Sequence, residues 1–367
     1  MMISTTIFPG RYVQGADALR RLGKDLSRLG RSALLVCDPF VFDRLLPEFR
    51  QSLEESLAIT AERFGGECSD EEIARLSELG RRVGCEVVAG VGGGKTLDTA
   101  KAVAYGLTVP AATVPTAAST DAPCSAVAVI YTPEGAFKRY LFLPRNPDLV
   151  LVDTTIIARA PVRFLVSGMG DALATWFEAD SCRQKYAGNM TGDVGSLTAY
   201  ALARLCYETL LADGLAAKVA CEAHAVTPAL EHIVEANTLL SGLGFESGGL
   251  AAAHAIHNGL TVLEPTHKYY HGEKVAVGTL ASLFLTDKPS ARREEAYAFC
   301  ESVGLPTTLA DIGLSRVSEG ELMQVAVAAC APGETIHNEP IPITPERVVS
   351  ALKVADAEGR RRKGVRG

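Results

Sequence analysis

Four of the seven histidines in the chain fall within eighteen residues, at His254, His257, His267 and His271. Neutral imidazoles together with a carboxylate suit Zn²⁺ or Fe²⁺, and three protein ligands would leave one position open for a substrate. His254 and His257 are three residues apart and would share one face of a helix, whereas His271 lies in a loop-like stretch before the next helix. The cluster therefore predicts a catalytic metal site, although spacing alone does not decide which three groups bind.

The candidate carboxylate for this site is Asp171, which follows Gly168 and Gly170. An acid after glycines at the start of a helix is equally typical of an N-cap, so that alternative stays open. Small residues surround His254 and would let another element of the chain approach it closely.

A glycine turn, Gly92-Gly93-Gly94-Lys95, separates a predicted strand from a predicted helix. Glycines let the backbone approach a phosphate, and the first N–H groups of the helix point at the anion. Neither the P-loop nor the dinucleotide fingerprint has the right spacing, because residue 89 is alanine and residue 97 is leucine. The turn predicts a phosphate site, and a tight strand-to-helix connection is the alternative.

Two more candidate groups follow predicted strands. Asp38 can accept hydrogen bonds from ribose hydroxyls and would repel a 2′-phosphate, which favours NAD over NADP; alternatively, Asp38 only begins a turn before Pro39. The loop 115–121 is small and rich in hydroxyl groups, and ligands of open α/β sheets bind beyond the carboxyl ends of the strands. Asp121, the only charged residue of this loop, can hold substrate hydroxyls.

The scaffold that positions these groups alternates between strands and helices over the first 150 residues. Buried strands are predicted at 32–37, 86–91, 110–114 and 149–153, helices at 71–83 and 96–104, and an extended pair at 125–131 and 139–143. This order indicates a parallel sheet with helices on both faces.

After Pro161 the sequence is dominated by stretches rich in alanine, leucine and glutamate, at 197–213, 228–242 and 248–260. We therefore predict two domains: an NAD-binding α/β domain with a Rossmann-like parallel sheet over 1–161, and an all-α, metal-binding domain over 162–367.

Composition excludes several classes of protein. The 367 residues are 47% hydrophobic and 22% charged with a net charge of −7, which is typical of a soluble globular protein and argues against a nucleic-acid partner. The basic tail 360–363 is predicted to be a solvent-exposed terminus rather than a nucleic-acid site. No apolar run is long enough to span a membrane, and the N-terminus does not resemble a secretory signal. Nine scattered cysteines without a CxxC pair predict reduced thiols and a cytoplasmic protein.

Over essentially its whole length the chain resembles the iron-containing alcohol dehydrogenase superfamily and, within it, the glycerol dehydrogenases. The residues that carry the resemblance are 92–101, 115–125, 170–176, 244–258 and 271–274. The resemblance implies a dehydroquinate synthase-like architecture, with a dinucleotide domain, a helical domain and a metal in the cleft between them. It also implies a homo-oligomer, since such members are often octamers.

Carried over by position, the implied metal ligands are Asp171, His254 and His271, which also contact the substrate. Asp121 would bind the polyol, and Asp121 and His254 are taken as the catalytic residues. The implied NAD contacts are Asp38, Gly93, Gly94, Lys95, Asp98, Thr116, Ser119, Ser125, Val127 and Tyr131.

The chain departs from the iron-using branch at one position, because that branch has a histidine four residues after the aspartate and this chain has Thr175. The departure favours Zn²⁺ over Fe²⁺. His257 and His267 then fall outside the ligand set, with a proton-relay role considered for His257.

The activity implied is the NAD-dependent oxidation of glycerol and related vicinal diols to dihydroxyacetone, with the reacting hydroxyl on the metal and hydride transfer to C4 of the nicotinamide. One rival is a lyase like dehydroquinate synthase, but a phosphorylated substrate needs several cations and residues 246–273 offer only Lys268. The other rival is an inactive binding module, which nothing in the sequence favours because the candidate ligands and both cofactor loops are present.

Overall fold

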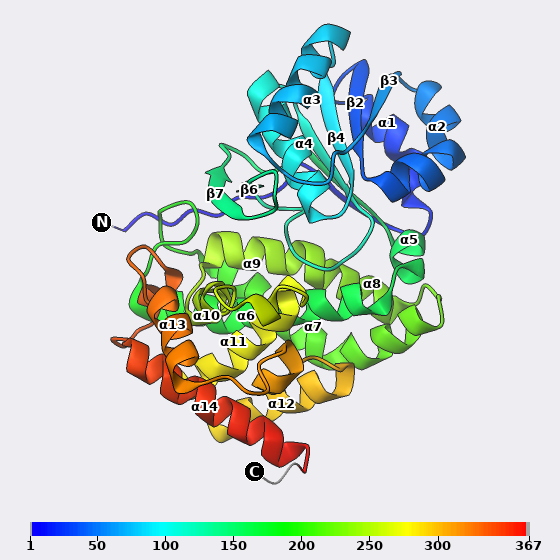
Figure 1. The fold of residues 1–367 in the computed structure, drawn as a ribbon. Coiled ribbons are helices and arrows are strands. Elements are labelled where there is room, and N and C mark those ends of the chain that lie inside the picture. The colour runs from blue at the N-terminus through cyan, green and yellow to red at the C-terminus, as the bar shows by residue number, and fades with distance from the viewer. Residues whose placement is uncertain (1, 365–367) are drawn as a thin grey trace. The chain divides into compact units, whose positions relative to one another are not determined.

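The computed structural model describes residues 2–364, which divide into two compact units (Figure 1). The sheet unit comprises residues 7–161 and 220–231, and the helical unit comprises the described residues of 1–6, 162–219 and 232–367. Residues 220–231 join the sheet unit partly through Glu231, whose carboxylate accepts hydrogen bonds from Gln14 and Thr154 at 2.8 and 2.7 Å. The assignment of NAD binding to 1–161 and of metal binding to 162–367 stays a prediction.

The sheet unit is built on six parallel strands in the order β1-β8-β5-β4-β2-β3. The predicted strands are confirmed as β2, β4, β5 and β8, and the sheet is completed by two edge strands, β1 and β3. The bounds are β1 (Tyr12–Gly15), β2 (Ser32–Cys37), β3 (Ala58–Arg63), β4 (Val87–Gly92), β5 (Ala111–Pro115) and β8 (Leu149–Asp153).

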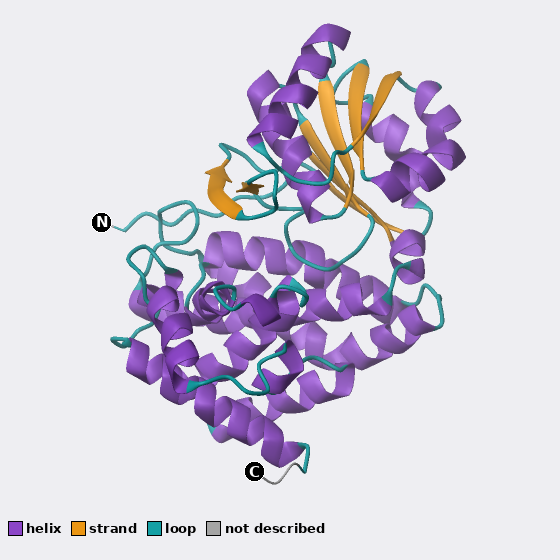
Figure 2. Cartoon of the chain, in the orientation of Figure 1, coloured by secondary structure: helices purple, strands orange, loops and turns teal. Residues whose placement is uncertain are grey.

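Helices cover both faces of this sheet (Figure 2). On β2 the side chains alternate, so that Leu35 packs with α1 and α2 on one face while Leu34 packs with α3 and α4 on the other. Burial on both faces is why these strands read as continuous apolar runs. The helices of this unit are α1 (Leu22–Leu26), α2 (Leu46–Glu54), α3 (Asp70–Val83), α4 (Gly94–Leu107) and α5 (Thr154–Arg159), with a 3₁₀ turn at Ala18–Arg21 and a π-helical turn at Val41–Leu45.

The predicted extended pair is confirmed as an antiparallel hairpin, β6 (Val127–Tyr131) and β7 (Phe137–Phe142), with an irregularity at Ile130/Tyr131. α4 anchors this hairpin through Asp98, whose carboxylate accepts a hydrogen bond from the backbone N–H of Val129 at 2.9 Å.

Every longer element of the helical unit in the described residues is a helix, as predicted. The helices are α6 (Val162–Lys185), α7 (Leu197–Glu222, whose last residues belong to the sheet unit), α8 (Pro228–Glu235, whose first residues belong to the sheet unit), α9 (Ser241–Gly248), α10 (Ala252–Leu260), α11 (His271–Leu285), α12 (Ser290–Val303), α13 (Glu319–Ala329) and α14 (Pro345–Arg362). Shorter turns lie at Ala236–Leu240, Glu264–Thr266, Leu309–Ile312 and Thr335–Asn338.

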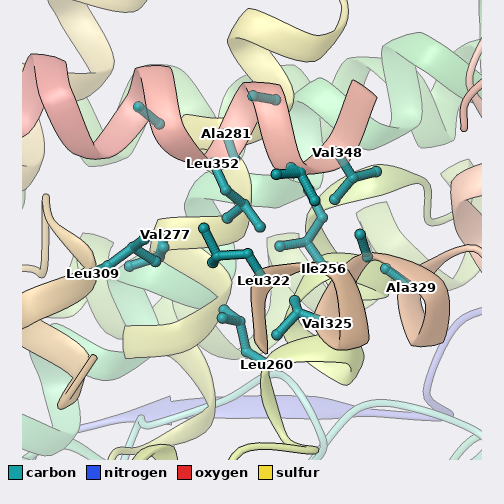
Figure 3. Close-up of a cluster of buried hydrophobic side chains, with 14 of the residues drawn as sticks. Ile256, Leu260, Val277, Ala281, Leu309, Leu322, Val325, Ala329, Val348 and Leu352 are labelled. Carbon is teal, nitrogen blue, oxygen red and sulfur yellow. The ribbon is translucent and has the colours of Figure 1, made fainter. Parts of the chain in front are cut away.

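The core of the helical unit lies between α10, α11, α13 and α14 (Figure 3). Ile256 of α10, Ala281 of α11, Val325 of α13 and Leu352 of α14 are all buried there. This packing fixes α10 and α11 against each other, and these two helices carry the candidate histidines.

The predicted helical stretch 248–260 is helical only from residue 252, because the chain of helices is interrupted after residue 248. α9 ends at Gly248 and α10 begins at Ala252, so a short turn precedes His254. The interruption places backbone N–H groups of the new helix beside that histidine.

None of the helices in the described part of the chain combines the length and the apolar character needed to cross a membrane. All nine cysteines are free thiols, and eight of them are buried.

Candidate functional site

Asp171 lies in the middle of α6 and is fully buried. The alternative that Asp171 is an N-cap is wrong, because α6 begins nine residues earlier at Val162. Within the described residues, its Oδ2 has no hydrogen-bond partner. A buried carboxylate oxygen without a partner is costly, so this atom is suited to receive a ligand.

His271 is the first residue of α11 rather than part of a loop, and a glycine contact sets its position. A Cβ atom on Gly272 would lie 1.8 Å from the carbonyl oxygen of Ser167 on α6. Only a residue without a side chain permits this approach of α11 to α6. As a result, Nε2 of His271 lies 3.0 Å from Oδ1 of Asp171.

His254 reaches the same carboxylate from α10. Its Nε2 lies 3.3 Å from Oδ1 of Asp171. A small buried cluster of Ala174, Ala253 and Val275 joins the three helices at this point, in agreement with the predicted close approach. The ligand atoms of Asp171, His254 and His271 all lie within 4.8 Å of one another.

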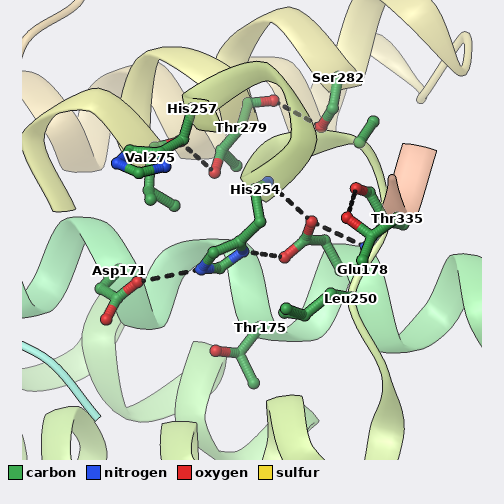
Figure 4. A network of polar contacts seen from close by, with 12 residues as sticks. Asp171, Thr175, Glu178, Leu250, His254, His257, Val275, Thr279, Ser282 and Thr335 are labelled. Atoms are coloured by element: carbon green, nitrogen blue, oxygen red, sulfur yellow. Dashed lines mark hydrogen bonds and ion pairs between the residues drawn. The ribbon is translucent and has the colours of Figure 1, made fainter. Parts of the chain in front are cut away.

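A second carboxylate, that of Glu178, holds the other side of the His254 ring (Figure 4). Glu178 lies on α6, two turns after Asp171, and is 1% exposed. Its Oε2 accepts a hydrogen bond from Nδ1 of His254 at 2.6 Å, and its Oε1 accepts from the backbone N–H groups of Ala251 and His254 at 2.9 and 3.0 Å. Glu178 is not among the residues predicted from the sequence. The available signal is its spacing of seven from Asp171, which puts both acids on one helix face.

Charge and burial act in opposite directions on these groups. Burial alone would lower the pKa of His254, but the charges of Glu178 and Asp171 raise it well above its usual value. Burial would raise the pKa of Asp171, yet His271 and His254 lower it below its usual range. The two carboxylates therefore create a site that favours positive charge, either protons or a cation.

The remaining residues of the histidine cluster lie outside this triad. The ring of His257 packs edge-on against that of His271, with centroids 4.2 Å apart, and burial lowers its pKa well below the usual value. His267 is exposed, and its Nε2 contacts the carbonyl oxygen of Thr261 at 2.8 Å. Thr175 pairs its hydroxyl with that of Ser241 at 2.9 Å.

The donor set fits a divalent cation such as Zn²⁺. Ligand atoms about 2.1 Å from a tetrahedral ion lie about 3.4 Å from one another, and the two contacts to Oδ1 of Asp171 measure 3.0 and 3.3 Å. A carboxylate and two imidazoles provide three ligands and leave one position open. Glu178 adds the carboxylate that usually orients a metal-bound histidine.

In the sheet unit, the predicted cofactor residues gather at the carboxyl ends of adjacent strands. Asp38 follows β2, Gly93 and Gly94 follow β4, and Thr116 follows β5. Gly92 has φ +153°, and a Cβ atom there would lie 2.6 Å from Oδ2 of Asp38. A glycine is therefore needed for this contact.

Gly93 and Gly94 border open space, since a Cβ atom on either residue would meet nothing within 4 Å. The N–H of Gly93 donates a hydrogen bond to the carboxylate of Asp38, and an anion site at the following N–H groups of α4 stays a prediction. Asp38 does begin a turn, because its Oδ1 accepts a hydrogen bond from the N–H of Val41 at 2.8 Å. Burial raises the pKa of Asp38.

Lys95 and Tyr131, both predicted cofactor contacts, lie together. Nζ of Lys95 is 4.9 Å from the centroid of the Tyr131 ring and donates to both carboxylate oxygens of Glu67 at 2.6 Å. Glu67 was not predicted. It would have to share Lys95 with a phosphate bound at the glycine turn.

Asp98 and Val127 serve internal contacts between α4 and β6. Asp98 pairs with the buried Lys101 at 2.9 Å, and Lys101 donates to the carbonyl oxygen of Val127. Ser119 and Asp121 lie partly buried in the loop after β5. Ser125 ends that loop and donates from its hydroxyl to the carbonyl oxygen of Ala122 at 3.3 Å.

Comparison with known proteins gives concordant matches. Residues 9–154 match the family described as iron-containing alcohol dehydrogenase. Glycerol dehydrogenase of Thermotoga maritima is 68% identical over 364 residues, which cover 99% of this chain and all of the relative. Glycerol dehydrogenase of Pseudomonas putida is 55% identical over 96% of each chain. The crystal structure of a probable glycerol dehydrogenase from Sinorhizobium meliloti matches with a TM-score of 0.92 at 47% identity, covering 98% of this chain and 100% of that one.

Proposed function

The chain belongs to the iron-containing alcohol dehydrogenase family, and from this premise we propose that it oxidises glycerol and related vicinal diols to hydroxyketones, glycerol giving dihydroxyacetone, with NAD as hydride acceptor. As a member of this family it is an oxidoreductase. The observation that carries the proposal is the convergence of one carboxylate and two imidazoles, whose ligand atoms all lie within 4.8 Å of one another, together with the unpartnered Oδ2 of the buried Asp171.

Asp171, His254 and His271 would hold a divalent cation, and we propose Zn²⁺ rather than Fe²⁺. The basis is Thr175, because the resemblance places a histidine at this position in the iron-using branch of the family. The Thr175 hydroxyl instead forms a hydrogen bond with that of Ser241. Three protein ligands leave room for a substrate hydroxyl. When bound, the cation would supply a Lewis acid that lowers the pKa of an alcohol, and the nicotinamide would accept hydride from the carbinol carbon.

The proposed NAD site is the edge formed by Asp38, the glycine turn and Thr116. The N–H groups at the start of α4, from Gly94 onward, would bind the pyrophosphate, and the open space beside Gly93 and Gly94 leaves room for it. Asp38 would accept hydrogen bonds from the ribose and disfavour a 2′-phosphate. Lys95 would add a positive charge, and Tyr131 a ring surface, beside the same turn.

The proposed polyol contact is Asp121, in the hydroxyl-rich loop after β5. Its carboxylate would accept hydrogen bonds from the hydroxyls that do not react and so restrict the reactive geometry. Asp121 and His254 remain the proposed catalytic residues. We also expect a homo-oligomer in the cytoplasm that has neither a nucleic-acid nor a membrane partner.

A panel of polyols tests the proposal, assayed with NAD and with NADP on metal-stripped and on zinc-restored protein. We expect NADH formation with glycerol and other vicinal diols only after zinc is restored, and NAD to be preferred. Activity that survives in chelator-treated, metal-stripped protein would contradict the metal site. The absence of NADH formation with every polyol would instead favour the lyase or an inactive binding module.

A further inference from the structure

Glu178 is a buried acid beside the candidate metal site that is not itself one of the three candidate ligands. We propose that Glu178 is a positioning residue that selects Nε2 of His254 as the atom that faces the cation. The inference rests on the proposed metal-dependent function. It concerns the proton on the opposite ring atom, Nδ1, which can be observed without the metal.

The contact geometry gives Glu178 control over the ring. Oε2 of Glu178 lies 2.6 Å from Nδ1 of His254, and only 1% of Glu178 is exposed, so bulk water does not compete for this bond. An ionised carboxylate only accepts hydrogen bonds, so Nδ1 must carry the hydrogen. Nε2, the other ring nitrogen, faces Oδ1 of Asp171 at 3.3 Å and is the atom left to bind the cation once its own hydrogen is lost.

The other oxygen of Glu178 fixes the orientation of the carboxylate. Oε1 accepts hydrogen bonds from the N–H groups of Ala251 and His254, which are backbone donors at the start of α10 and cannot reverse their roles. Any side chain that replaces Glu178 must therefore present an acceptor at this point. The ring contact and the helix contact are made by two different atoms of one group.

A separate set of bonds also holds the start of α10. Oε1 of Glu339 accepts a hydrogen bond from the N–H of Ala252 at 3.0 Å, and the Thr335 hydroxyl donates to the carbonyl oxygen of Ala251 at 2.7 Å. Glu339 thus anchors the same turn as Glu178, but its contact is with the backbone rather than with the His254 ring. This difference makes Glu339 the matched control.

Glu178→Gln has a consequence that a purely structural role would not produce. The two backbone donors require the amide oxygen of Gln, so its NH₂ group must face Nδ1 of His254. The ring then accepts at Nδ1 and, when neutral, carries its hydrogen on Nε2, where it blocks coordination. Glu178→Ala leaves the ring free to adopt either tautomer, although it removes more hydrogen bonds from the helix start.

The experiment measures Zn²⁺ affinity of the metal-stripped full-length protein by calorimetry against a competing chelator. We expect Glu178→Gln to weaken binding by about 10–100-fold, as for other partners that orient metal ligands. Glu178→Ala should weaken it less than Glu178→Gln but lower the melting temperature more. Glu339→Gln should stay within about threefold of wild type, because it keeps an acceptor for Ala252. In ¹⁵N spectra of the metal-free proteins, His254 should carry hydrogen on Nδ1 in wild type and only on Nε2 in Glu178→Gln.

The outcomes separate the two proposals. A wild-type protein that does not bind Zn²⁺ would overturn the metal site, while the ring spectra would still decide the role of Glu178. If Glu178→Gln binds Zn²⁺ as tightly as Glu339→Gln, or keeps hydrogen on Nδ1, the positioning role is wrong. It is equally wrong if Glu178→Ala binds less tightly than Glu178→Gln. Should Glu178→Ala fail to fold, the two Gln variants and the spectra decide.

Discussion

In the sheet unit, the candidate cofactor groups come directly after strands β2, β4 and β5, so the order of the strands alone brings them together. In the helical unit, the candidate ligands are far apart in the sequence and meet because α6, α10 and α11 pack closely. The first arrangement follows mainly from the topology of the sheet. The second depends on tight backbone contact between helices, and one added methyl group at that contact is expected to disturb it.

The largest effect should follow from the loss of one packed ligand. We expect His271→Ala to abolish tight Zn²⁺ binding and to lower kcat/KM with glycerol by about 10³-fold, because a catalytic cation stabilises the transition state by several kcal/mol. Steady-state kinetics and metal analysis check this. His267→Ala is the control and should change kcat/KM by less than about twofold, because that residue is exposed. Normal turnover of His271→Ala in chelator-treated buffer would show that the ligand assignment is wrong.

A pH response is expected from Glu339, the buried acid of the helical unit that accepts a hydrogen bond from the start of α10. Burial, with a further contribution from the charge of Glu178, raises the pKa of Glu339 to about 7 from an ordinary value of 4.5. The folded state therefore binds this proton more tightly, and its contribution to the free energy of unfolding decreases as pH rises from about 4.5 to about 7, by on the order of 3 kcal/mol. Denaturant unfolding of metal-free wild type and Glu339→Gln at several pH values checks this. A pH-independent difference between the two proteins would contradict it.

A smaller effect is expected from a single methyl group at the contact of α6 and α11. Gly272→Ala should destabilise the protein by about 2 kcal/mol through overpacking and should also weaken Zn²⁺ binding, since the new carbon would overlap the carbonyl oxygen of Ser167. Thermal unfolding and zinc titration measure both effects. Gly320→Ala in α13 is the control, because a Cβ atom there would lie 3.9 Å from Oγ of Ser318, which is an ordinary van der Waals distance. We expect that substitution to be neutral or slightly stabilising. Equal stability of the two variants would contradict the tight contact between Gly272 and α6.

The smallest effect should come from a side chain at the sheet edge. Asp38→Asn keeps an acceptor for Val41 but removes the charge, so the preference for NAD over NADP should fall by about tenfold while stability changes little. The ratio of kcat/KM values for the two cofactors measures this. Asp43→Asn removes an exposed acid that pairs with Arg63, and its ratio should stay at the wild-type value. An unchanged ratio in Asp38→Asn would remove Asp38 from the cofactor site.

The sequence predicts the central strands of the sheet unit but not its edge strands, for a physical reason. β2, β4, β5 and β8 are buried on both faces and therefore read as apolar runs, whereas β3 is an edge strand with mostly half-exposed residues and β1 is only four residues long. Both edge strands were missed. The glycine turn could be predicted because consecutive residues define it, between one strand and the next helix.

The candidate ligands were named only through a family resemblance. Spacing left Asp171 open to interpretation as an N-cap, because nothing near it in the sequence indicates that α6 begins at Val162. Glu178 was missed, since acids on helices are usually solvated and its partners come from a turn more than seventy residues later. Tertiary packing, which local patterns do not encode, determines both.

The approach of α11 to α6 at Gly272 also determines how the ligand atoms are arranged before any cation binds. Backbone atoms are in contact there, so no rotation of a side chain can move α11 further in, and the packed core resists movement outward. The ligand atoms of Asp171, His254 and His271 are thereby held close to one another before any ion arrives. An entering cation would replace protons held between these groups rather than assemble the site. Binding is therefore expected to involve little loss of conformational entropy.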